Sequence, residues 1–467
     1  MNIYTEDKLC IKVNNRVTNT FIANQGVKQG CILSPLLFNI FLSDLQTKLE
    51  KTESAPLLLT RNERIGCLIW ADDLLIFSET ENGLQNMLND LGNYAANNGL
   101  SVNMTKTKVM IFNKTGRHMR RNFYLNNIKI DTTREYKYLG FLVTPSGEIN
   151  SGLHDLKDRA LRALMKIRNK LGIFFLRYPS VSLKLFDALV KPILLYASDF
   201  WGILKLPNNN PIEHLHHNCC KQILGVQKQT SNIGVLLELG QVPLSLYAIK
   251  NAIKNWERIA IKRAANGLVI KGYDNGIIEN HVWSNRIKST LTEIGMMESF
   301  QDNKPREKTH VKIFQRLCDI FHQNSFANIN TESSKLRTYS TFKKDIGCER
   351  YLNSIQNTDA RISFTKFRLS NHCLMIEKGR HKNIDKNQRF CPFCPSMIED
   401  EVHFLLECKR FESCRKTFLE NIYAITREPL PREKMQIFIY LMSREQTTGL
   451  TAQYIIDTLQ TRELLLK

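Results

Sequence analysis

The sequence predicts an α+β protein whose strands lie mostly in its first third. Three observations indicate this. Short apolar or alternating runs, separated by turn residues, fill residues 1–147, as expected for strands joined by tight turns. From Ser151 to about Ala264 the apolar residues recur at helical spacing instead. Three cysteines and a histidine gather between residues 391 and 408, which predicts a small module held by a metal ion.

The length and charge of the chain bound its class. At 467 residues it is long enough for roughly two to four domains, each with its own core. Lys and Arg outnumber Asp and Glu by 65 to 45, which gives a net charge of +20. Residues 1–145 hold 17 of the basic and 13 of the acidic residues, so most of the surplus lies beyond them. A surplus of this size favours a polyanionic partner such as nucleic acid, although a solvated basic surface also explains it.

The sequence shows no targeting or membrane segment. Residues 2–7 contain neither the basic nor the apolar part of a secretory signal, and no apolar run reaches the length of a membrane span. Most of the twelve cysteines stand singly among apolar residues, which suits a reducing compartment. We therefore expect an intracellular protein, in the nucleus or the cytoplasm, that does not bind membranes.

The chain opens with a hairpin signal and a glycine-bearing loop. Residues 8–13 and 16–23 alternate or run apolar around Asn14-Asn15, a pair suited to a two-residue turn. The loop Gly26-Val27-Lys28-Gln29-Gly30-Cys31 follows, and its two glycines would let a ligand approach the backbone closely. A loop of this kind that leads into a helix can hold a phosphate, but more often it has no ligand.

The helix after this loop has clear start signals. Ser34 is a good N-cap and Pro35 a good first helical residue, and the apolar pattern predicts a helix from Leu36 to about Leu49.

Two adjacent carboxylates lie at the tip of a second predicted hairpin. The apolar strands 65–69 and 74–77 meet at Trp70-Ala71-Asp72-Asp73. An acidic pair in a tight turn repels itself, and a divalent cation shared with a substrate phosphate relieves that repulsion. Such a tip suits two-metal phosphoryl transfer. Taken alone, Asp-Asp at a turn is more often solvated and without chemistry.

The next elements surround a lysine. Apolar residues from Leu84 to Tyr94 recur at helical spacing, and Gly99 is suited to close that helix. Residues 100–103 and 108–112 are predicted strands on either side of the turn Met104-Thr105-Lys106-Thr107. Residues 136–143 form another apolar stretch, which ends at a Pro-Ser-Gly turn.

The helical middle of the chain is rich in basic residues. One run carries Arg159, Arg162, Lys166, Arg168 and Lys170. A basic helix fits a grip on a nucleic-acid backbone, and a solvated helix face fits the pattern equally well. Further on, three histidines adjoin two cysteines within residues 214–220, but they cannot all face one ion within a single helical turn, so we expect no metal there.

The last informative cluster has the spacing of a zinc site. Cys391 and Cys394 form a Cys-x-x-Cys pair, and His403 and Cys408 follow on a predicted helical turn. Three thiolates and an imidazole complete a tetrahedral Zn²⁺ shell with no open position, so this zinc would be structural. The alternative is four unrelated buried or free groups, but this polar stretch has little core of its own.

Four of these segments, in their order along the chain, resemble consecutive palm motifs of reverse transcriptases. They are the Gly26–Cys31 loop with Ser34–Phe38, then Ala71-Asp72-Asp73, Asn103–Lys108 and Tyr138-Leu139-Gly140. The resemblance is closest to the polymerases of non-LTR, LINE-type retrotransposons, which also commonly carry a zinc-knuckle-like element near their C-terminus. Four motifs in the right order are much more specific than any one of them.

The resemblance implies a role for each motif. Asp72 would bind Mg²⁺ or Mn²⁺, with Asp73 as its partner near the primer end. Gln29 and Gly30, with Trp70 close by, would contact the nucleotide and template. Lys106 would protonate the pyrophosphate leaving group, although it fits a solvated turn lysine as well. Tyr138, Leu139 and Gly140 would form the primer grip, or else only an edge strand.

Two features depart from the family pattern. The aromatic residue before Ala-Asp-Asp is usually Tyr or Phe, and here it is Trp70. In the family another aspartate, on a strand upstream of the first hairpin, shares the metal ions, and fingers segments lie further upstream. Asp7 is the only aspartate before the Gly26–Cys31 loop, and its surroundings do not match. We therefore expect little or no polymerisation by this chain alone.

The sequence thus predicts a partial polymerase palm, a mainly helical thumb and connector, and a small zinc module. The expected division is 1–147 palm, 148–265 thumb-like region, 266–384 helical connector, 385–415 zinc knuckle-like element and 416–467 one or two C-terminal helices. The implied partners are an RNA template, a DNA primer and deoxynucleoside triphosphates. The alternative is a non-catalytic nucleic-acid-binding remnant with a structural zinc, and a metal-dependent nuclease is a third possibility.

Overall fold

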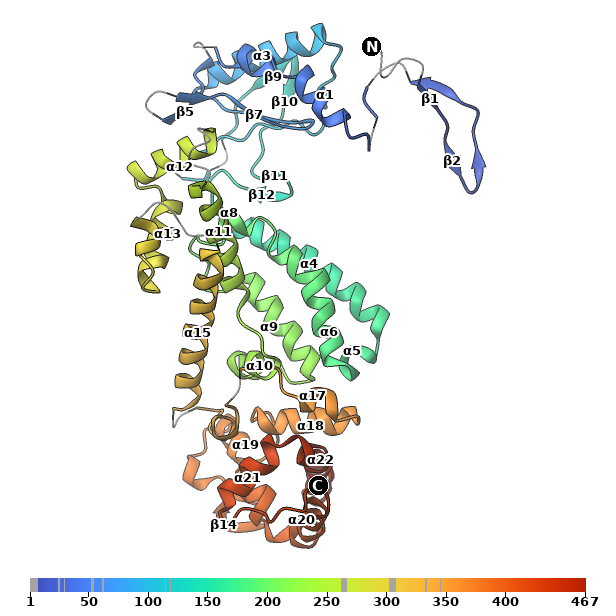
Figure 1. Cartoon of the computed structure of the whole chain (residues 1–467), viewed down its shortest axis with the longest axis vertical. Coiled ribbons are helices and arrows are strands. Elements are labelled where there is room, and N and C mark those ends of the chain that lie inside the picture. The colour runs from blue at the N-terminus through green and yellow to red at the C-terminus, as the bar shows by residue number, and fades with distance from the viewer. Residues whose placement is uncertain are drawn as a thin grey trace. The chain divides into compact units, whose positions relative to one another are not determined.

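The computed structural model divides the chain into two compact units (Figure 1). Unit 1 comprises residues 1–136, 144–147 and 266–279, and unit 2 comprises residues 137–143, 148–265 and 280–467. The residues that the structure describes are 7–23, 26–28, 30–51, 54–60, 63–113, 115–117, 119–261, 267–301, 308–331, 334–344 and 346–467. The expected five-part division of the chain stays a prediction.

Unit 1 begins with the predicted hairpin. Strand β2 (Lys12–Val13) pairs with β3 (Arg16–Val17), and β1 (Asp7–Leu9) pairs with β4 (Phe21–Ala23). Asn14 and Asn15 have φ angles of 47° and 64°. Two central residues with positive φ are the mark of a type I′ turn, whose twist matches that of the strands it joins. The prediction of a two-residue turn at this asparagine pair is confirmed.

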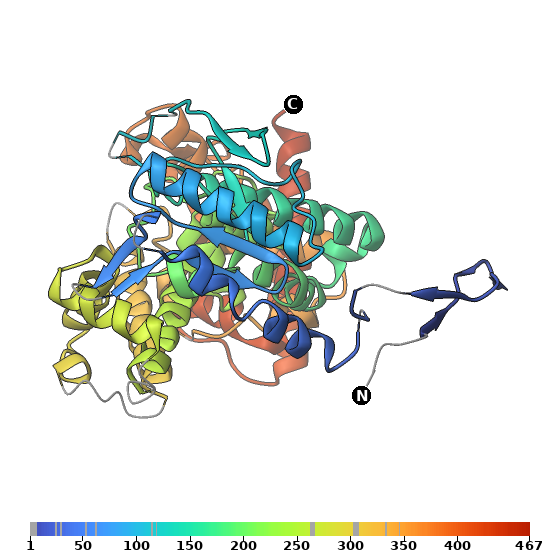
Figure 2. The ribbon, with the colours of Figure 1, turned by 90° about the horizontal axis from the view of Figure 1, so that it is seen from above.

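The core of unit 1 forms beneath helix α3 (Glu81–Asn97), which lies across the unit in Figure 2. Its buried face contributes Met87, Leu88, Leu91 and Tyr94, at the predicted helical spacing. The helix ends as expected, since Gly99 has a φ of 64° and the amide of Leu100 donates to the carbonyl of Ala95 at 2.9 Å.

Two antiparallel hairpins supply the strands near this helix. Strand β5 (Leu57–Thr60) pairs with β6 (Glu63–Ile65), and β7 (Cys67–Trp70) pairs with β8 (Asp73–Ile76). The buried side chain of Cys67 joins the apolar core, with Ile69, Leu74 and Ile76 packed against it.

The helix predicted over residues 36–49 is broken. Helix α1 spans Ser34–Phe41 and α2 spans Leu45–Leu49, with a turn between them. The hydroxyl of Tyr94 donates to the carboxylate of Asp44 at 2.7 Å and also lies 3.2 Å from the carbonyl oxygen of Phe41. Tyr94 of α3 thus contacts the backbone and a side chain at the break. The apolar pattern of residues 36–49 could not predict this contact, because it comes from another helix.

The strands predicted at 100–103 and 108–112 were wrong. Among the described residues there, only Val109 forms an isolated parallel bridge, with Thr132. A hairpin forms instead from β9 (Phe123–Leu125) and β10 (Ile128–Ile130), with positive φ at Asn126 and Asn127. Both strands bury phenylalanine or aliphatic side chains in the unit 1 core.

A segment from much later in the chain returns to unit 1. Helix α12 (Leu268–Ile278) packs against β5, where Gly272 lies close to Leu59, and Lys271 forms an ion pair with Glu63 on the paired strand β6. The sequence pattern predicted only a helical connector here. The residues of this helix do not indicate that its packing partner lies some 200 residues away in sequence.

Unit 2 begins with a hairpin and continues as helices. The apolar stretch 136–143 folds back on itself as β11 (Tyr136–Tyr138) and β12 (Phe141–Val143). The helices that follow are α4 (Asn150–Leu171), α5 (Phe174–Arg177), α6 (Pro179–Leu185), α7 (Lys191–Leu194), α8 (Ser198–Trp201), α9 (Pro211–Leu224), α10 (Asn232–Leu239), α11 (Leu244–Ile261), α13 (Val282–Glu293), α14 (Glu298–Gln301) and α15 (Thr309–Ile329). The mainly helical character expected of this region is confirmed.

The rest of unit 2 continues the same apolar core. It comprises α16 (Tyr339–Phe342), α17 (Tyr351–Ser354), α18 (Thr358–Arg368), α19 (Met375–His381), the hairpin β13 (Phe390–Cys391) and β14 (Cys394–Ile398), a π-helical turn η5 (His403–Glu407), α20 (Glu412–Thr426), α21 (Lys434–Ser443) and α22 (Glu445–Leu465). Three helices therefore close the chain, one more than the upper expectation. The break at Arg427, whose φ is 52°, separates α20 from α21.

No single helix in the described part of the chain is long and apolar enough to cross a membrane. The pair α10 and α11 meets the same length and composition test only when taken together, across a 69° bend.

Candidate active site and metal centre

The predicted acidic hairpin forms, but with strands at 67–70 and 73–76 in place of the predicted 65–69 and 74–77, so Trp70 and Asp73 belong to the strands. Trp70 pairs with Asp73 and Cys67 with Ile76, so Ala71 and Asp72 alone make the turn. Ala71 has a φ of 52°, and Asp72 is not among the residues with positive φ. Positive φ at the first central residue only is the sign pattern of a type II′ turn. We call residues Trp70–Asp73 the carboxylate turn.

The strand register places the aromatic ring and one carboxylate on the same face. Directly opposed residues of an antiparallel pair project to the same side, so Trp70 and Asp73 lie together on the face opposite the core. Both aspartates are exposed, and 67% of the Trp70 surface is exposed. Two carboxylates and a large ring therefore face solvent at one turn, where oxygen ligands for a hard divalent cation are available.

The loop before α1 is closed by a serine. The hydroxyl of Ser34 donates to the carbonyl of Lys28 at 2.7 Å, and Gly26 and Gly30 both have positive φ. Ser34 is thus the first helical residue and not the N-cap, a position that Leu33 occupies. Gln29 lies outside the described residues. Space for a ligand remains at Gly30, because nothing among the described residues lies within 4 Å of where a Cβ would be.

Lys106 lies on a turn opened by an asparagine. The amide of Lys106 and the hydroxyl of Thr105 both donate to the side-chain oxygen of Asn103, at 3.2 and 2.7 Å. The Tyr136 hydroxyl donates to the carbonyl of Lys106 at 3.3 Å. The backbone of the turn is therefore fixed while the Lys106 side chain is exposed.

The predicted primer grip is a turn and not part of one strand. Leu139 and Gly140, with φ angles of 44° and 81°, connect β11 to β12. The Tyr196 hydroxyl donates to the carbonyl of Leu139, and Arg159 donates to the carbonyl of Gly140 at 2.9 Å. A Cβ at Gly140 would lie 3.1 Å from the Tyr196 hydroxyl oxygen, so glycine meets both the φ and the space requirement.

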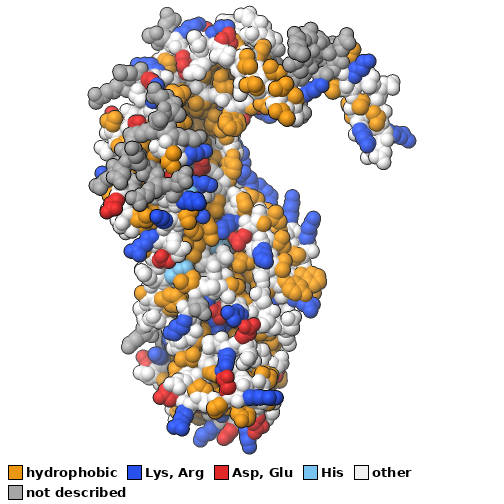
Figure 3. Space-filling model, in the orientation of Figure 1, with side chains coloured by type: hydrophobic (Ala, Val, Ile, Leu, Met, Phe, Trp, Pro, Cys, Tyr) orange, Lys and Arg blue, Asp and Glu red, His pale blue; other side chains and the backbone are white. Residues whose placement is uncertain are grey.

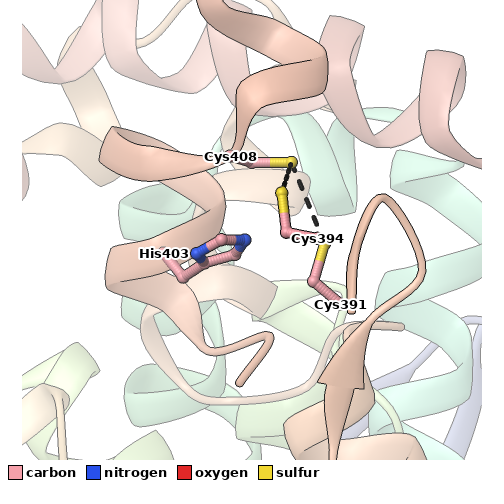
Figure 4. A group of neighbouring side chains, drawn as sticks. All are labelled: Cys391, Cys394, His403 and Cys408. Atoms are coloured by element: carbon pink, nitrogen blue, oxygen red, sulfur yellow. Dashed lines mark hydrogen bonds between the residues drawn. The ribbon is translucent and has the colours of Figure 1, made fainter. Parts of the chain in front are cut away.

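The four predicted zinc ligands come together in unit 2 (Figure 4). The candidate ligand atoms of Cys391, Cys394, His403 and Cys408 all lie within 4.8 Å of one another, and all four residues are buried. We call them the Cys–His cluster. The sulfur of Cys408 lies 3.9 Å from that of Cys391 and 4.0 Å from that of Cys394. Tetrahedral zinc with bonds of about 2.3 Å requires sulfur atoms about 3.8 Å apart, so the cluster fits the ion.

The contact between Cys391 and Cys408 shifts their pKa values in opposite directions. Hydrogen bonding to Cys408, followed by burial, raises the pKa of Cys391 to about 12, whereas the same contact lowers the pKa of Cys408. Both ring nitrogens of His403 are buried without a hydrogen-bond partner in the described structure. A dication would stabilise several thiolates at once and give the imidazole a partner.

A buried ion pair between Glu399 and Arg462 packs against the Cys–His cluster. The sulfur of Cys391 lies 4.0 Å from a carboxylate oxygen of Glu399, and Arg462 on α22 donates to both oxygens of that carboxylate at 2.7 Å. Arg415 donates to the carbonyl of Cys408 at 3.0 Å. Sequence reasoning missed these three partners. Arg462 lies 54 residues after the last ligand, and Glu399 and Arg415, although within seven residues of a ligand, do not belong to the spacing that defines the cluster.

Comparison with known protein families finds a match in the first part of the chain. Residues 2–143 match the family model described as reverse transcriptase (RNA-dependent DNA polymerase). Those residues carry a reverse transcriptase domain. They include the carboxylate turn, the Gly26–Cys31 loop, Lys106 and the β11–β12 turn.

Curated relatives narrow the type of reverse transcriptase domain. A Pol polyprotein of the type-1 retrotransposable element R2 from Nasonia vitripennis is 25% identical over 262 residues, 51% of this chain and 25% of the relative. The same element from Popillia japonica is 31% identical over 173 residues, 36% of this chain and 28% of the relative. A probable RNA-directed DNA polymerase from transposon BS of Drosophila melanogaster is 29% identical over 232 residues, which are 47% of this chain and 24% of the relative.

These relatives identify the domain as the non-LTR retrotransposon type, which confirms the resemblance inferred from the four motifs. The matched part of the chain spans about a quarter of the length of these relatives. The comparisons leave the zinc knuckle resemblance a prediction.

Of the three histidines of α9, His216 takes up a core position, His217 is partly buried and His214 is exposed. His216 is buried, with its ring stacked on Phe186 at 5.4 Å and on His217 at 5.9 Å between centroids. Burial, the largest influence, lowers the pKa of His217 to about 4. Cys219 and Cys220 are buried in the apolar core of unit 2.

A second buried ion network organises unit 2. Arg368 donates to Glu238 at 2.6 Å and to Glu349 at 2.7 Å, and the hydroxyls of Tyr339 and Tyr351 donate to Glu238. Burial alone would raise the pKa of Glu238, but the charge and hydrogen bonds of Arg368 hold it below its ordinary value. The structure thus gives Glu238 a structural role in the core of unit 2.

Proposed function

We propose that the reverse transcriptase domain supports RNA-directed DNA synthesis at the carboxylate turn. The observation that carries the proposal is the exposed pair Asp72 and Asp73, at a two-residue turn inside the segment that matches the family. When bound, two Mg²⁺ or Mn²⁺ ions would lower the pKa of the primer hydroxyl and stabilise charge on the leaving group. RNA template, DNA primer and deoxynucleoside triphosphates are the proposed substrates.

The chain's own residues would divide the work. Asp72 would hold metal, and Asp73 with Trp70 would face the primer end. The primer 3′-oxygen forms a bond to the α-phosphorus while the bond from that phosphorus to the pyrophosphate oxygen breaks. Lys106, exposed on its fixed turn, would give a proton to that oxygen.

Two further contacts belong to the same proposal. Gln29 and Gly30 would border the nucleotide and template. The Tyr138-Leu139-Gly140 turn would support the primer backbone through groups that Tyr196 and Arg159 hold in place.

The Cys–His cluster is proposed to bind one structural Zn²⁺. The near-ideal sulfur spacing and the unpartnered imidazole nitrogens support this. With all four positions taken by protein, the ion would activate no water. It would instead fix the β13–β14 hairpin to η5 and present the neighbouring basic residues to RNA.

For the 467 residues tested by themselves, we expect weak or undetectable extension. Asp72 and Asp73 come from one turn, and a two-metal centre takes carboxylates from more than one strand. The second candidate function, a non-catalytic nucleic-acid-binding protein, is favoured by the charge of +20.

Primer extension tests the proposal. An RNA template with an annealed DNA primer is incubated with Mg²⁺ or Mn²⁺ and deoxynucleotides, using the chain, Asp72→Ala and Asp131→Ala. Asp131 is an exposed aspartate of the same unit and serves as the matched control. Where extension is too slow to detect, the metal-dependent part of template–primer binding is measured with the same three proteins.

The outcomes separate the candidate functions. Extension, or metal-dependent binding, that Asp72→Ala removes and Asp131→Ala retains supports the polymerase site. Binding that is independent of metal and of Asp72 supports the non-catalytic function. Template degradation that requires Asp72 would instead indicate a nuclease.

Lys106→Met refines the role of the lysine. Removing a general acid lowers turnover by about 10²- to 10⁴-fold. We expect the extension rate to fall while template–primer affinity stays constant. An unchanged rate would make Lys106 a solvated turn residue.

A further inference from the structure

Unit 2 carries a group of exposed apolar and aromatic side chains whose exposed surfaces do not contribute to the packing of the core. It lies where α4 ends and α5 and α6 follow, and it consists of four side chains with large exposed surfaces: Ile173 (75%), Phe174 (48%), Tyr178 (46%) and Val181 (48%). We call it the aromatic tip. Orange side chains with blue ones around them cover this region of α5 in Figure 3.

The two rings of the aromatic tip are arranged side by side. The centroids of Phe174 and Tyr178 lie 6.0 Å apart with an angle of 17° between the ring planes. The guanidinium of Arg177 lies 5.7 Å from the centroid of Tyr178. Nearly parallel rings with a cation at the edge form a flat, partly cationic surface.

The backbone beneath these rings is fixed by buried groups. Arg361 on α18, only 2% exposed, donates to the carbonyl of Arg177 at 2.9 Å and to the carbonyl of Leu176. Ser182 donates to the carbonyl of Phe175 at 2.8 Å, and the ring of Phe175 is in the core. Because these contacts hold the backbone, the exposed rings are presented rigidly without contributing to the core.

The stretch of sequence that carries the aromatic tip has charges of one sign. Residues 159–186 contain seven basic residues and no acidic residue. Six of the seven are exposed, namely Arg162, Lys166, Arg168, Lys170, Arg177 and Lys184. A long stretch without a carboxylate repels basic partners and attracts polyanions.

We propose that the aromatic tip is a stacking site for single-stranded nucleic acid. Unpaired bases offer flat faces to Phe174 and Tyr178, while the phosphates between them match the flanking cations. A duplex would satisfy only the cations, because its base faces are already stacked inside the helix. An anionic membrane would take up the apolar side chains but gives the parallel rings no role. This site goes beyond the proposed polymerase function and does not depend on it.

Binding of a 12-nucleotide oligouridylate, followed by fluorescence anisotropy, tests the proposal on the full chain. Phe174→Ala and Tyr178→Ala should each weaken binding about five- to 150-fold, the range for loss of one base–aromatic stack. Tyr178→Trp should retain affinity. The matched control is Tyr423→Ala, which removes a 58%-exposed ring from α20 and should change nothing. Equal melting temperatures for all variants show that folding is unaffected.

Salt dependence separates the two components of the site. Lys170→Gln should lower the slope of log affinity against log salt by about 0.7, the value for one phosphate contact on a single strand. Tyr178→Ala should lower affinity at every salt concentration without changing that slope. Ultraviolet cross-linking of a 4-thiouridine oligonucleotide should map to Phe174 or Tyr178.

Several results would overturn the proposal. Unchanged affinity in both ring variants, cross-links that avoid residues 173–181, or an equal loss in the Tyr423→Ala control would each do so. An equal loss of affinity for duplex RNA would show that the site grips a duplex. Binding to phosphatidylserine vesicles that depends on Phe174 while oligouridylate binding does not would show a membrane site.

Discussion

The carboxylate turn lies on a β-hairpin and the Cys–His cluster takes two of its four residues from one, yet the two sites differ in almost every physical respect. Asp72 and Asp73 are exposed at the tip of β7 and β8. Cys391 and Cys394 are buried at the turn between β13 and β14, with an ion pair packed beneath them. A group that acts on a substrate must stay open to it, whereas a structural ion must be enclosed. The difference predicts which variants affect folding and which affect binding.

Loss of a cluster ligand should give the largest effect on stability. Cys408→Ser removes one of the four ligands of the proposed structural zinc, and zinc binding contributes about 10–16 kcal/mol to folding in small modules. We expect loss of one bound zinc per chain, measured by elemental analysis, and destabilisation on the order of 5 kcal/mol in unit 2. Cys414→Ser, at an exposed cysteine six residues later, is the control. Full zinc content in Cys408→Ser would contradict the assignment.

The ion pair beneath the cluster should give the next largest effect. Arg462→Met leaves Glu399 buried without its bidentate partner, which costs about 3–5 kcal/mol. Denaturant unfolding should show this loss while zinc content remains. Arg444→Met breaks the pair with Glu428 at the protein surface and should leave the unfolding midpoint almost unchanged. Similar shifts of the unfolding midpoint in Arg462→Met and Arg444→Met would contradict the expected difference between a buried and a surface ion pair.

A smaller effect of opposite sign is expected at the carboxylate turn. Ala71 has a φ of 52°, a left-handed conformation that costs about 1–2 kcal/mol for a residue with a Cβ. Ala71→Gly removes that cost but adds flexibility to the unfolded chain worth about 0.4–1 kcal/mol. Net stabilisation of about 0.5–1 kcal/mol in the unfolding of unit 1 should result. Destabilisation would show that the alanine methyl group makes a contact worth more than the strain.

The smallest effect on stability should come from the aspartates themselves. Asp72→Asn removes one of two adjacent like charges at an exposed turn, so the unfolding midpoint of unit 1 should stay the same or rise slightly. Thermal melting of the variant beside the parent chain checks this. A clear drop in melting temperature would mean that Asp72 stabilises the hairpin and is not held free for a ligand.

Local features of the structure could be predicted from the sequence. Asn14-Asn15, Gly99 and the turn at Asp72 were all predicted, because turn residues and apolar periodicity fix backbone geometry within a few positions. The gathering of the four Cys–His residues was also predicted, since their types and spacing are those of zinc ligands.

Features that depend on distant contacts could not be predicted. The break between α1 and α2 is occupied by Tyr94, some 50 residues away, and the apolar stretch 136–143 folds back at Leu139-Gly140. The return of α12 to β5 and the pair of Arg462 with Glu399 join residues separated by 63 positions or more. The apolar periodicity of each segment does not indicate which distant segment it will contact. The contacts that hold both candidate sites in place could therefore be found only in the structure.

Manganese binding at the carboxylate turn tests the central claim most directly. The electron paramagnetic resonance signal of free Mn²⁺ is followed while the zinc-loaded chain is added, with an RNA template, a DNA primer and a non-hydrolysable deoxynucleotide present. We predict that the parent chain and Asp131→Ala reduce the free signal equally and that Asp72→Ala does not. Equal uptake of Mn²⁺ by Asp72→Ala would contradict a metal-dependent polymerase site at this turn.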